Sequence, residues 1–351
     1  MNMSAWLDKT HLGDCRSLMK RMIADGVKVN CVVTSPPYWG LRDYNIAGQF
    51  GLERSWVRHV ARMRGVFRIV RELLEEDGTL WLNYGDSYAS DGGPGWQGKN
   101  GQRSARRFTL QRDSVAMRQC RRSARDGLKP KDLVGMPWRV ALALQASGWW
   151  LRSDVIWSKP NPMPESIKDR PTKAHEYLFL LAKSQRYYYN ADAAREPSTG
   201  GAHPRGAGLH RKVAGWADGP GSHSAKDHAR RAQGLRDSTK FGRGPGWRNK
   251  QNCSFSAAVT DTVNDRNLRT VWTIPTEKFP GPHFATFPRN LVALCILAGT
   301  RPGDVVLDPF MGSGTVAQVA VDLGRHFIGC ELSAEYLALH RMRATTQGMP
   351  L

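Results

Sequence analysis

The stretch DVVLDPFMGSGT, residues 304–315, decides the fold class of this chain. Its first five residues form an apolar run between two aspartates, which predicts a buried strand, and residues 315–323 have helical periodicity. In doubly wound α/β folds, a loop between a strand and a helix lies where ligands bind, outside the carboxyl ends of the strands. Gly312 and Gly314 allow the backbone to approach a ligand closely. The stretch therefore predicts an α/β domain with a ligand-binding loop.

Strands and helices alternate on both sides of this loop. The apolar patterns predict strands at 28–34, 79–83, 150–157, 177–182, 304–308 and 326–330. They predict helices at 55–76, 131–145, 288–298 and 315–323, the first of which stops at Gly78. This alternation favours a doubly wound, mostly parallel sheet, and we find no internal repeat.

The loop lacks the marks of a phosphate site. No lysine precedes its Ser/Thr, as a phosphate-cradling loop requires, and the dinucleotide spacing G-x-G-x-x-G is not met. Asp308 instead offers a carboxylate to a cationic, amino-acid-like group, and Glu331, at the end of the next strand, can accept hydrogen bonds from ribose hydroxyls. An adenosine without phosphates fits this set, so S-adenosylmethionine is the cofactor we expect. The alternative is a tight turn beside a surface glutamate.

A second motif, TSPPYW at residues 34–39, follows the predicted strand at 28–34. Pro36 and Pro37 fix the backbone and withhold two N–H donors, which leaves the Ser35 hydroxyl and nearby carbonyls as acceptors. An exocyclic amine of a base is a poor nucleophile because its lone pair is delocalised, and acceptors that hold its hydrogens would favour a tetrahedral nitrogen. Tyr38 would stack on an extruded base, with Trp39 in support. The alternative is a proline-kinked loop.

The charge of the chain points to a polyanionic partner. The 351 residues carry a net charge of +20, with a pI near 10.1, and nucleic acid is the usual partner of such a protein. Arginines crowd residues 91–126, and residues 195–252 are rich in glycine and basic residues, so both segments are expected to contact nucleic-acid phosphates. The alternatives are solvated loops and a simply very soluble basic protein.

Several classes of protein are disfavoured. The longest apolar run, at 291–298, is too short to span a bilayer, and the N-terminal residues lack the layout of a secretion signal, so we expect a cytoplasmic protein. The six cysteines include no CxxC pair, and the histidines at 203, 210, 223 and 228 lack paired spacing. We therefore expect neither a metal site nor a disulfide framework.

SPPY together with DPFMGSGT resembles the amino-methyltransferase family of DNA modification enzymes. The order of the two motifs is similar to that of the beta class, whose chain is circularly permuted. The resemblance implies a Rossmann-like fold and methyl transfer from S-adenosylmethionine to an exocyclic amino nitrogen of a flipped base. It implies as catalytic residues Ser35, Pro36, Pro37 and Tyr38, and as cofactor-binding residues Asp308, Phe310, Gly312, Gly314, Glu331, Asp14 and Phe287.

Further roles rest on the same resemblance. Asp14 would contact the adenine of the cofactor, residues 283–288 would wrap its methionine end, and residues 175–177 would lie near the target-base pocket. The implied organisation is a catalytic half at 1–190 with a basic insertion at about 90–130, a target-recognition region at 191–270 and a cofactor half at 271–351. Double-stranded DNA is the implied partner, in the setting of a restriction–modification system, and a homodimer is typical of the class.

The sequence does not decide whether the target amine is cytosine N4 or adenine N6. Serine at the first position of the tetrapeptide is more often associated with cytosine N4 in the family, and aspartate with adenine N6. We favour cytosine N4, although a neutral hydroxyl can accept from either amine. Two other classes compete: an RNA or protein amide methyltransferase, which more usually begins this motif with asparagine, and a non-catalytic DNA-binding protein.

Overall fold

The computed structural model describes residues 3–44, 46–89, 126–197, 265–277 and 287–338. Within these ranges eight strands form one sheet in the order β1-β10-β9-β2-β3-β5-β4-β8. Their bounds are β1 (Lys9–Leu12), β2 (Val29–Thr34), β3 (Leu74–Tyr84), β4 (Trp150–Ser158), β5 (His175–Ala182), β8 (Val271–Thr273), β9 (Val305–Asp308) and β10 (His326–Glu331). The first five strands in this order, β1, β10, β9, β2 and β3, are parallel to one another, whereas β5 runs antiparallel to β3 and to β4. The prediction of a mostly parallel α/β sheet is confirmed.

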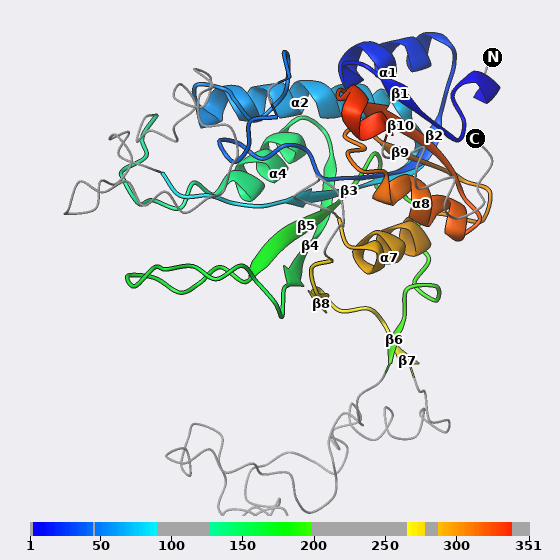
Figure 1. The fold of residues 1–351 in the computed structure, drawn as a ribbon. Coiled ribbons are helices and arrows are strands. Elements are labelled where there is room, and N and C mark those ends of the chain that lie inside the picture. The colour runs from blue at the N-terminus through cyan, green and yellow to red at the C-terminus, as the bar shows by residue number, and fades with distance from the viewer. Residues whose placement is uncertain (1–2, 45, 90–125, 198–264, 278–286, 339–351) are drawn as a thin grey trace, which may run out of the picture. The chain divides into compact units, whose positions relative to one another are not determined.

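Helices cover both faces of the sheet (Figure 1). On one face lie α1 (Cys15–Ala24), α2 (Trp56–Leu73) and α4 (Met136–Ala146), and on the other lie α7 (Arg289–Gly299) and α8 (Thr315–Asp322). Side chains along β2 alternate between the two cores: Val32 packs in the first, whereas Cys31 and Val33 pack in the second. Burial on both faces explains the apolar run at 31–33.

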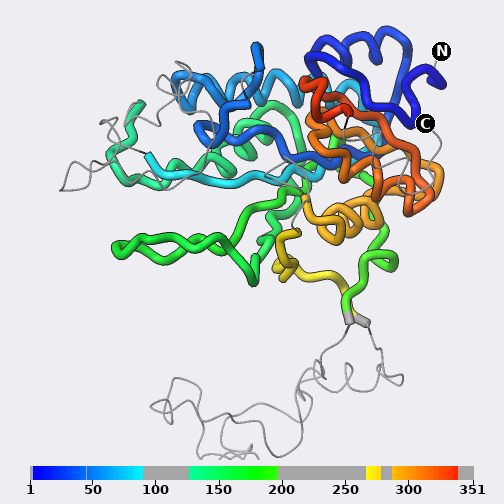
Figure 2. Tube along the Cα trace, in the orientation of Figure 1, coloured from blue at the N-terminus to red at the C-terminus, as the bar shows by residue number. Residues whose placement is uncertain are grey.

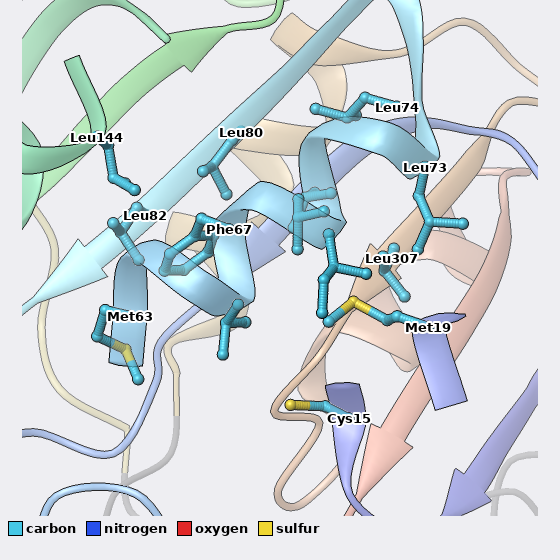
Figure 3. Close-up of a cluster of buried hydrophobic side chains, with 14 of the residues drawn as sticks. Cys15, Met19, Met63, Phe67, Leu73, Leu74, Leu80, Leu82, Leu144 and Leu307 are labelled. Carbon is cyan, nitrogen blue, oxygen red and sulfur yellow. The ribbon is translucent and has the colours of Figure 1, made fainter. Parts of the chain in front are cut away.

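The first core fixes the central strands from the side of α2. Met63 and Phe67 of α2 are fully buried and pack with Leu80 and Leu82 of β3 and with Leu307 of β9 (Figure 3). Such close packing tolerates little movement of the strands it joins. The residues that follow β2, β3 and β9 therefore start from fixed positions.

The predicted boundary between α2 and β3 was wrong. The helix predicted at 55–76 ends at Leu73, and the next strand starts at Leu74 instead of residue 79. Gly78 lies inside this strand, at an irregularity where the pairing with β2 changes register. A Cβ on Gly78 would lie 2.8 Å from Leu74 and 3.1 Å from the Asn30 carbonyl, so the glycine permits a close approach of strands.

The helix predicted at 131–145 begins only at Met136. Lys131 and Gly135 both have a φ of 71°, which a helix interior does not allow. The strands β1 and β8 and the helix α1 were not predicted.

The chain between β4 and β5 leaves the sheet along residues 159–174 and returns, as the tube in Figure 2 shows. At its base the Lys159 N–H donates to the Ala174 carbonyl, 2.8 Å away. Lys159 and Glu176, one on each side of this extension, are thereby held next to each other.

The chain divides into two compact units, 1–194 with 268–351 and 195–267. Of the second unit the structure describes β6 (Glu196–Pro197) paired with β7 (Asp265–Arg266). Several predictions fall outside the described residues: most of the basic segments at 91–126 and 195–252, the histidines at 203, 210, 223 and 228, and residues 283–286. The domain limits and the recognition role of 191–270 stay predictions.

Within the described ranges, no helix has the length and apolar character needed to cross a membrane. The same residues contain no cluster of histidine, cysteine, aspartate and glutamate that could hold a metal ion. The cysteines at 15, 31, 295 and 330 are buried and free.

Candidate active site

The predicted site residues meet at one edge of the sheet. Ser35 follows β2, Asp308 and Glu331 are the last residues of β9 and β10, and Asp14 lies two residues beyond β1. These four strands are consecutive, parallel neighbours, so their carboxyl ends share one edge. The structure thus brings together residues from both ends of the sequence.

A buried hydrogen bond joins the two motifs directly. The Thr34 hydroxyl donates to Asp308 Oδ1 at 2.6 Å, across 274 residues of sequence, and the Phe310 N–H donates to the same oxygen at 2.9 Å. Asp308 is 3% exposed, and its burial raises the pKa of the carboxyl to about 7. A cationic ligand group beside Asp308 would favour the ionised form, which burial disfavours.

Glu331 holds the glycine loop. Its Oε2 accepts the Gly312 N–H at 2.7 Å and its Oε1 accepts the Ser333 N–H at 2.7 Å, while burial raises the pKa of the carboxyl. Gly312 and Gly314 have φ values of 56° and 81°, in the left-handed region that favours glycine. Gly314 caps α8. The role of Glu331 toward ribose stays a prediction.

Asp14 caps α1. Its Oδ1 accepts the backbone N–H groups of Arg16 and Ser17, at 2.9 and 3.2 Å, and its Oδ2 pairs with the Arg16 guanidinium at 2.8 Å. Hydrogen bonding to Arg16 lowers the pKa of Asp14. The preceding Gly13 donates its N–H to the Glu331 carbonyl at 2.8 Å, which places the cap beside the end of β10. Contact with an adenine stays a prediction.

Aromatic side chains pack around the glycine loop. The Phe310 ring meets Phe50 edge to face, with centroids 5.5 Å apart, and the Arg62 guanidinium lies 4.2 Å from the centre of the Phe50 ring. Phe50 follows the tetrapeptide by twelve residues and has no motif around it, so sequence reasoning missed it. Phe287 is half-buried and packs on the second core, and its predicted contact with the cofactor stays untested.

The tetrapeptide is joined to β3 and β5 by its side chains. Ser35 Oγ lies 3.1 Å from the Tyr38 hydroxyl and 3.3 Å from Asn83 Oδ1, and the Tyr38 hydroxyl lies 2.8 Å from Glu176 Oε2. Pro36 is buried and Pro37 half-buried. Asn83 carries no motif signal and was missed, whereas Glu176 lies in the segment that the family resemblance implicated.

Tyr38 rests on a second tyrosine. Its ring stacks on Tyr84 of β3, with centroids 5.0 Å apart and an interplanar angle of 29°. A Cβ on Gly85 would lie 2.5 Å from the Tyr38 ring, so a glycine is required there. One face of Tyr38 is therefore occupied by the protein, and the residue as a whole is half-buried.

A buried polar chain supports Tyr84 from α2. His59 Nδ1 lies 2.6 Å from Glu53 Oε2, and His59 Nε2 contacts the Tyr84 hydroxyl. Glu53 also accepts the Gly51 N–H through Oε2, and through its carbonyl it accepts the indole N–H of Trp39 at 2.8 Å. The loop after the tetrapeptide is thus tied to the helix beneath it. Sequence reasoning missed His59 and Glu53, which lie outside any motif.

The chain is similar to known DNA methylases. Residues 29–341 match the N6/N4 methyltransferase family, described as DNA methylase. The type II methyltransferase M.Cfr9I of Citrobacter freundii is 40% identical over 333 residues, which cover 94% of this chain and 86% of the relative.

Two solved structures share the fold. The PvuII DNA methyltransferase (cytosine-N4-specific) aligns with a TM-score of 0.55 at 16% identity, over 95% of this chain and 85% of that one. A candidate DNA modification methylase of Thermus thermophilus, complexed with S-adenosylmethionine, aligns with a TM-score of 0.51 at 22% identity, over 96% and 93% of the two chains.

Proposed function

The chain belongs to the N6/N4 DNA methylase family, and from this premise we propose that it is a site-specific type II methyltransferase that methylates cytosine N4 in double-stranded DNA. The observation that carries the proposal is the hydrogen bond between Thr34 and Asp308. This bond supports the proposal because it joins the acceptor-rich tetrapeptide, which we assign to the amine, to the carboxylate and glycine loop, which we assign to the methyl donor.

The cofactor side of the edge fits S-adenosylmethionine. When bound, this cofactor supplies an electrophilic methyl group. Asp308 would pair with its ammonium group, Gly312 and Gly314 would allow close approach of the backbone, and Phe310 and Phe287 would contribute apolar surface. Glu331 would accept from the ribose hydroxyls and Asp14 would lie against the adenine.

The target side suits an exocyclic amine. The Ser35 hydroxyl and the Ser35 and Pro36 carbonyls accept hydrogen bonds, and neither proline donates one. Acceptors that hold both hydrogens of the amine favour a tetrahedral nitrogen whose lone pair points at the methyl group. The hydrogen bonds to these acceptors strengthen as positive charge develops on that nitrogen. Serine at position 35 favours cytosine N4 over adenine N6.

The target base would lie outside the duplex. Enzymes that modify a base generally extrude it into a pocket lined by stacking side chains. Tyr38 presents one ring face to Tyr84, so its other face is the surface that we assign to the base. The second unit, residues 195–267, would read the DNA sequence, and its basic residues would contact phosphates.

The test is the chemical identity of the product. The purified chain is incubated with S-adenosylmethionine and unmethylated bacterial genomic DNA, and in parallel with RNA, and the nucleosides are analysed by mass spectrometry. N4-methylcytosine in DNA is expected. N6-methyladenine in DNA would support a DNA methyltransferase but overturn cytosine as the target base. Methylation of RNA alone would overturn DNA as the substrate.

A further inference from the structure

A line of hydrogen-bonded side chains lies behind Ser35. Lys159 pairs with Glu176 Oε1, Glu176 Oε2 lies 2.8 Å from the Tyr38 hydroxyl, and that hydroxyl lies 3.1 Å from Ser35 Oγ. The side chains of Lys159 and Glu176 are each 17% exposed, so this ion pair is largely shielded from water. Asn83 Oδ1 faces both hydroxyls, at 3.3 Å from Ser35 and 2.9 Å from Tyr38.

Counting hydrogens assigns directions to these bonds. Tyr38 has a single hydroxyl hydrogen, and burial raises the pKa of this phenol well above its usual value, so it remains a donor. A carboxylate paired with Lys159 only accepts, and hydrogen bonds to a charged acceptor are stronger than those to a neutral amide. The Tyr38 hydrogen therefore goes to Glu176, and Ser35 does not receive it.

Asn83 completes the assignment. Its Nδ2 donates to the Tyr177 carbonyl at 3.1 Å, which turns Oδ1 toward the two hydroxyls. With the Tyr38 hydrogen committed to Glu176, both Asn83 Oδ1 and the Tyr38 oxygen can accept the Ser35 hydrogen. The Ser35 hydroxyl then donates into the protein, and its oxygen lone pairs remain for an outside donor.

We propose that the juxtaposition of Lys159, Glu176 and Asn83 with Tyr38 sets the direction of the Ser35 hydroxyl, so that Ser35 acts only as an acceptor toward the target amine. Glu176, Lys159 and Asn83 are positioning residues in this arrangement, because they act through Ser35. This inference rests on the proposed function of Ser35 in amine methylation.

The test is a double-mutant cycle between Glu176 and the hydroxyl of Tyr38. Glu176→Gln replaces an acceptor-only carboxylate with a neutral amide of the same shape, and Tyr38→Phe removes the hydroxyl but keeps the ring for stacking. Each single variant is expected to lower kcat about 10- to 100-fold, the range of one charge-assisted hydrogen bond. The KM for S-adenosylmethionine should stay within about twofold, because Glu176 lies on the target side of the edge.

The kcat of the double variant decides whether Glu176 acts through the Tyr38 hydroxyl. If Glu176 acts through the Tyr38 hydroxyl, Tyr38→Phe/Glu176→Gln should have the kcat of the slower single variant, because the line is already broken. Losses that multiply would show that Glu176 acts on its own and would overturn the proposal, as would wild-type kcat in Glu176→Gln. Should Glu176→Gln fail to fold, the same cycle with Lys159→Gln makes the same distinction.

Two controls separate this inference from the proposed function. Glu165→Gln removes the carboxylate that pairs with Arg170 at 2.7 Å on the extension between β4 and β5, and it should leave kcat unchanged. Ser35→Ala should abolish most turnover. If Ser35→Ala retained turnover, the proposed function of Ser35 would fail and the inference with it. If Ser35→Ala were inactive but the losses of kcat in the Glu176 and Tyr38 variants multiplied, the inference would fail while the proposed function of Ser35 would stand.

Discussion

The two sides of the catalytic edge are built in different ways. On the cofactor side, the carboxylates mainly accept backbone N–H groups: Asp308 from a residue two positions away, and Glu331 from residues two and 19 positions away. One side-chain bond, from the Thr34 hydroxyl to Asp308, spans 274 residues. On the target side, side chains bind side chains over long separations, 48 residues from Ser35 to Asn83 and 138 from Tyr38 to Glu176. The cofactor side is therefore held mainly through backbone groups of contiguous motifs, whereas the target side depends on side chains that only the folded chain brings together.

The largest expected difference between the two sides is that a change on the target side lowers turnover without changing cofactor binding. Ser35→Ala should lower kcat about 10²- to 10³-fold, because its hydrogen bond strengthens toward the transition state. Affinity for S-adenosylmethionine should stay within about twofold. Single-turnover kinetics and titration calorimetry measure the two quantities, and equal losses in both would contradict the division into two sides.

The cofactor side should respond to pH through Asp308. The pKa of this carboxyl is raised to about 7, so it ionises as pH rises through 7 and becomes neutral as pH falls below it. Affinity for the cationic cofactor should be highest above pH 7 and fall about tenfold for each pH unit below it. Calorimetry between pH 5.5 and 8 measures this. Asp308→Asn should bind more weakly at pH 8 and show a flat profile, and a flat profile in the wild type would argue against the pairing.

The target side should be the less tolerant of added volume. Gly85→Ala places a methyl group 2.5 Å from the Tyr38 ring, and we expect a loss of about 1–3 kcal/mol in the free energy of unfolding, together with lower kcat. Gly65→Ala is the matched control, because a Cβ there meets nothing within 4 Å and the residue lies within α2. That variant should gain about 0.5–1 kcal/mol. Urea denaturation measures both, and similar effects would refute the tight fit of Tyr38.

The smallest expected effect separates two roles of Asp14. Asp14→Ala should cost about 1 kcal/mol of stability through loss of the cap of α1, whereas Asp14→Asn keeps a good cap and should cost a few tenths. If Asp14 also contacts the adenine, both variants should lose affinity for S-adenosylmethionine. Thermal melting measures the change in stability, and calorimetry measures the affinity for S-adenosylmethionine. Unchanged affinity in both variants would show that Asp14 only caps α1.

What the sequence predicted follows the same division. The loop at 308–315 and the tetrapeptide at 35–38 were found because their residue types are contiguous, and apolar runs located most strands of the sheet. Asn83, His59 and Glu53 were not found, since a buried polar residue has no periodicity that marks its partner. Gly78 misled the prediction because a glycine that ends a helix and one that permits close strand packing look alike in sequence.

The pairing of β1 with β10 has a consequence for how the enzyme is made. Asp8 contacts His326, 318 residues later, and β10 can join the sheet only after the ribosome has produced it. At the usual pace of translation the N-terminal strand waits roughly 15–60 s for its partner. During that time β1 and the β9 side of β2 are open strand edges, which invite pairing with other chains. Asp308 and Glu331, which we assign to the cofactor, are also synthesised late, so the proposed site is complete only when nearly all of the described fold has been made.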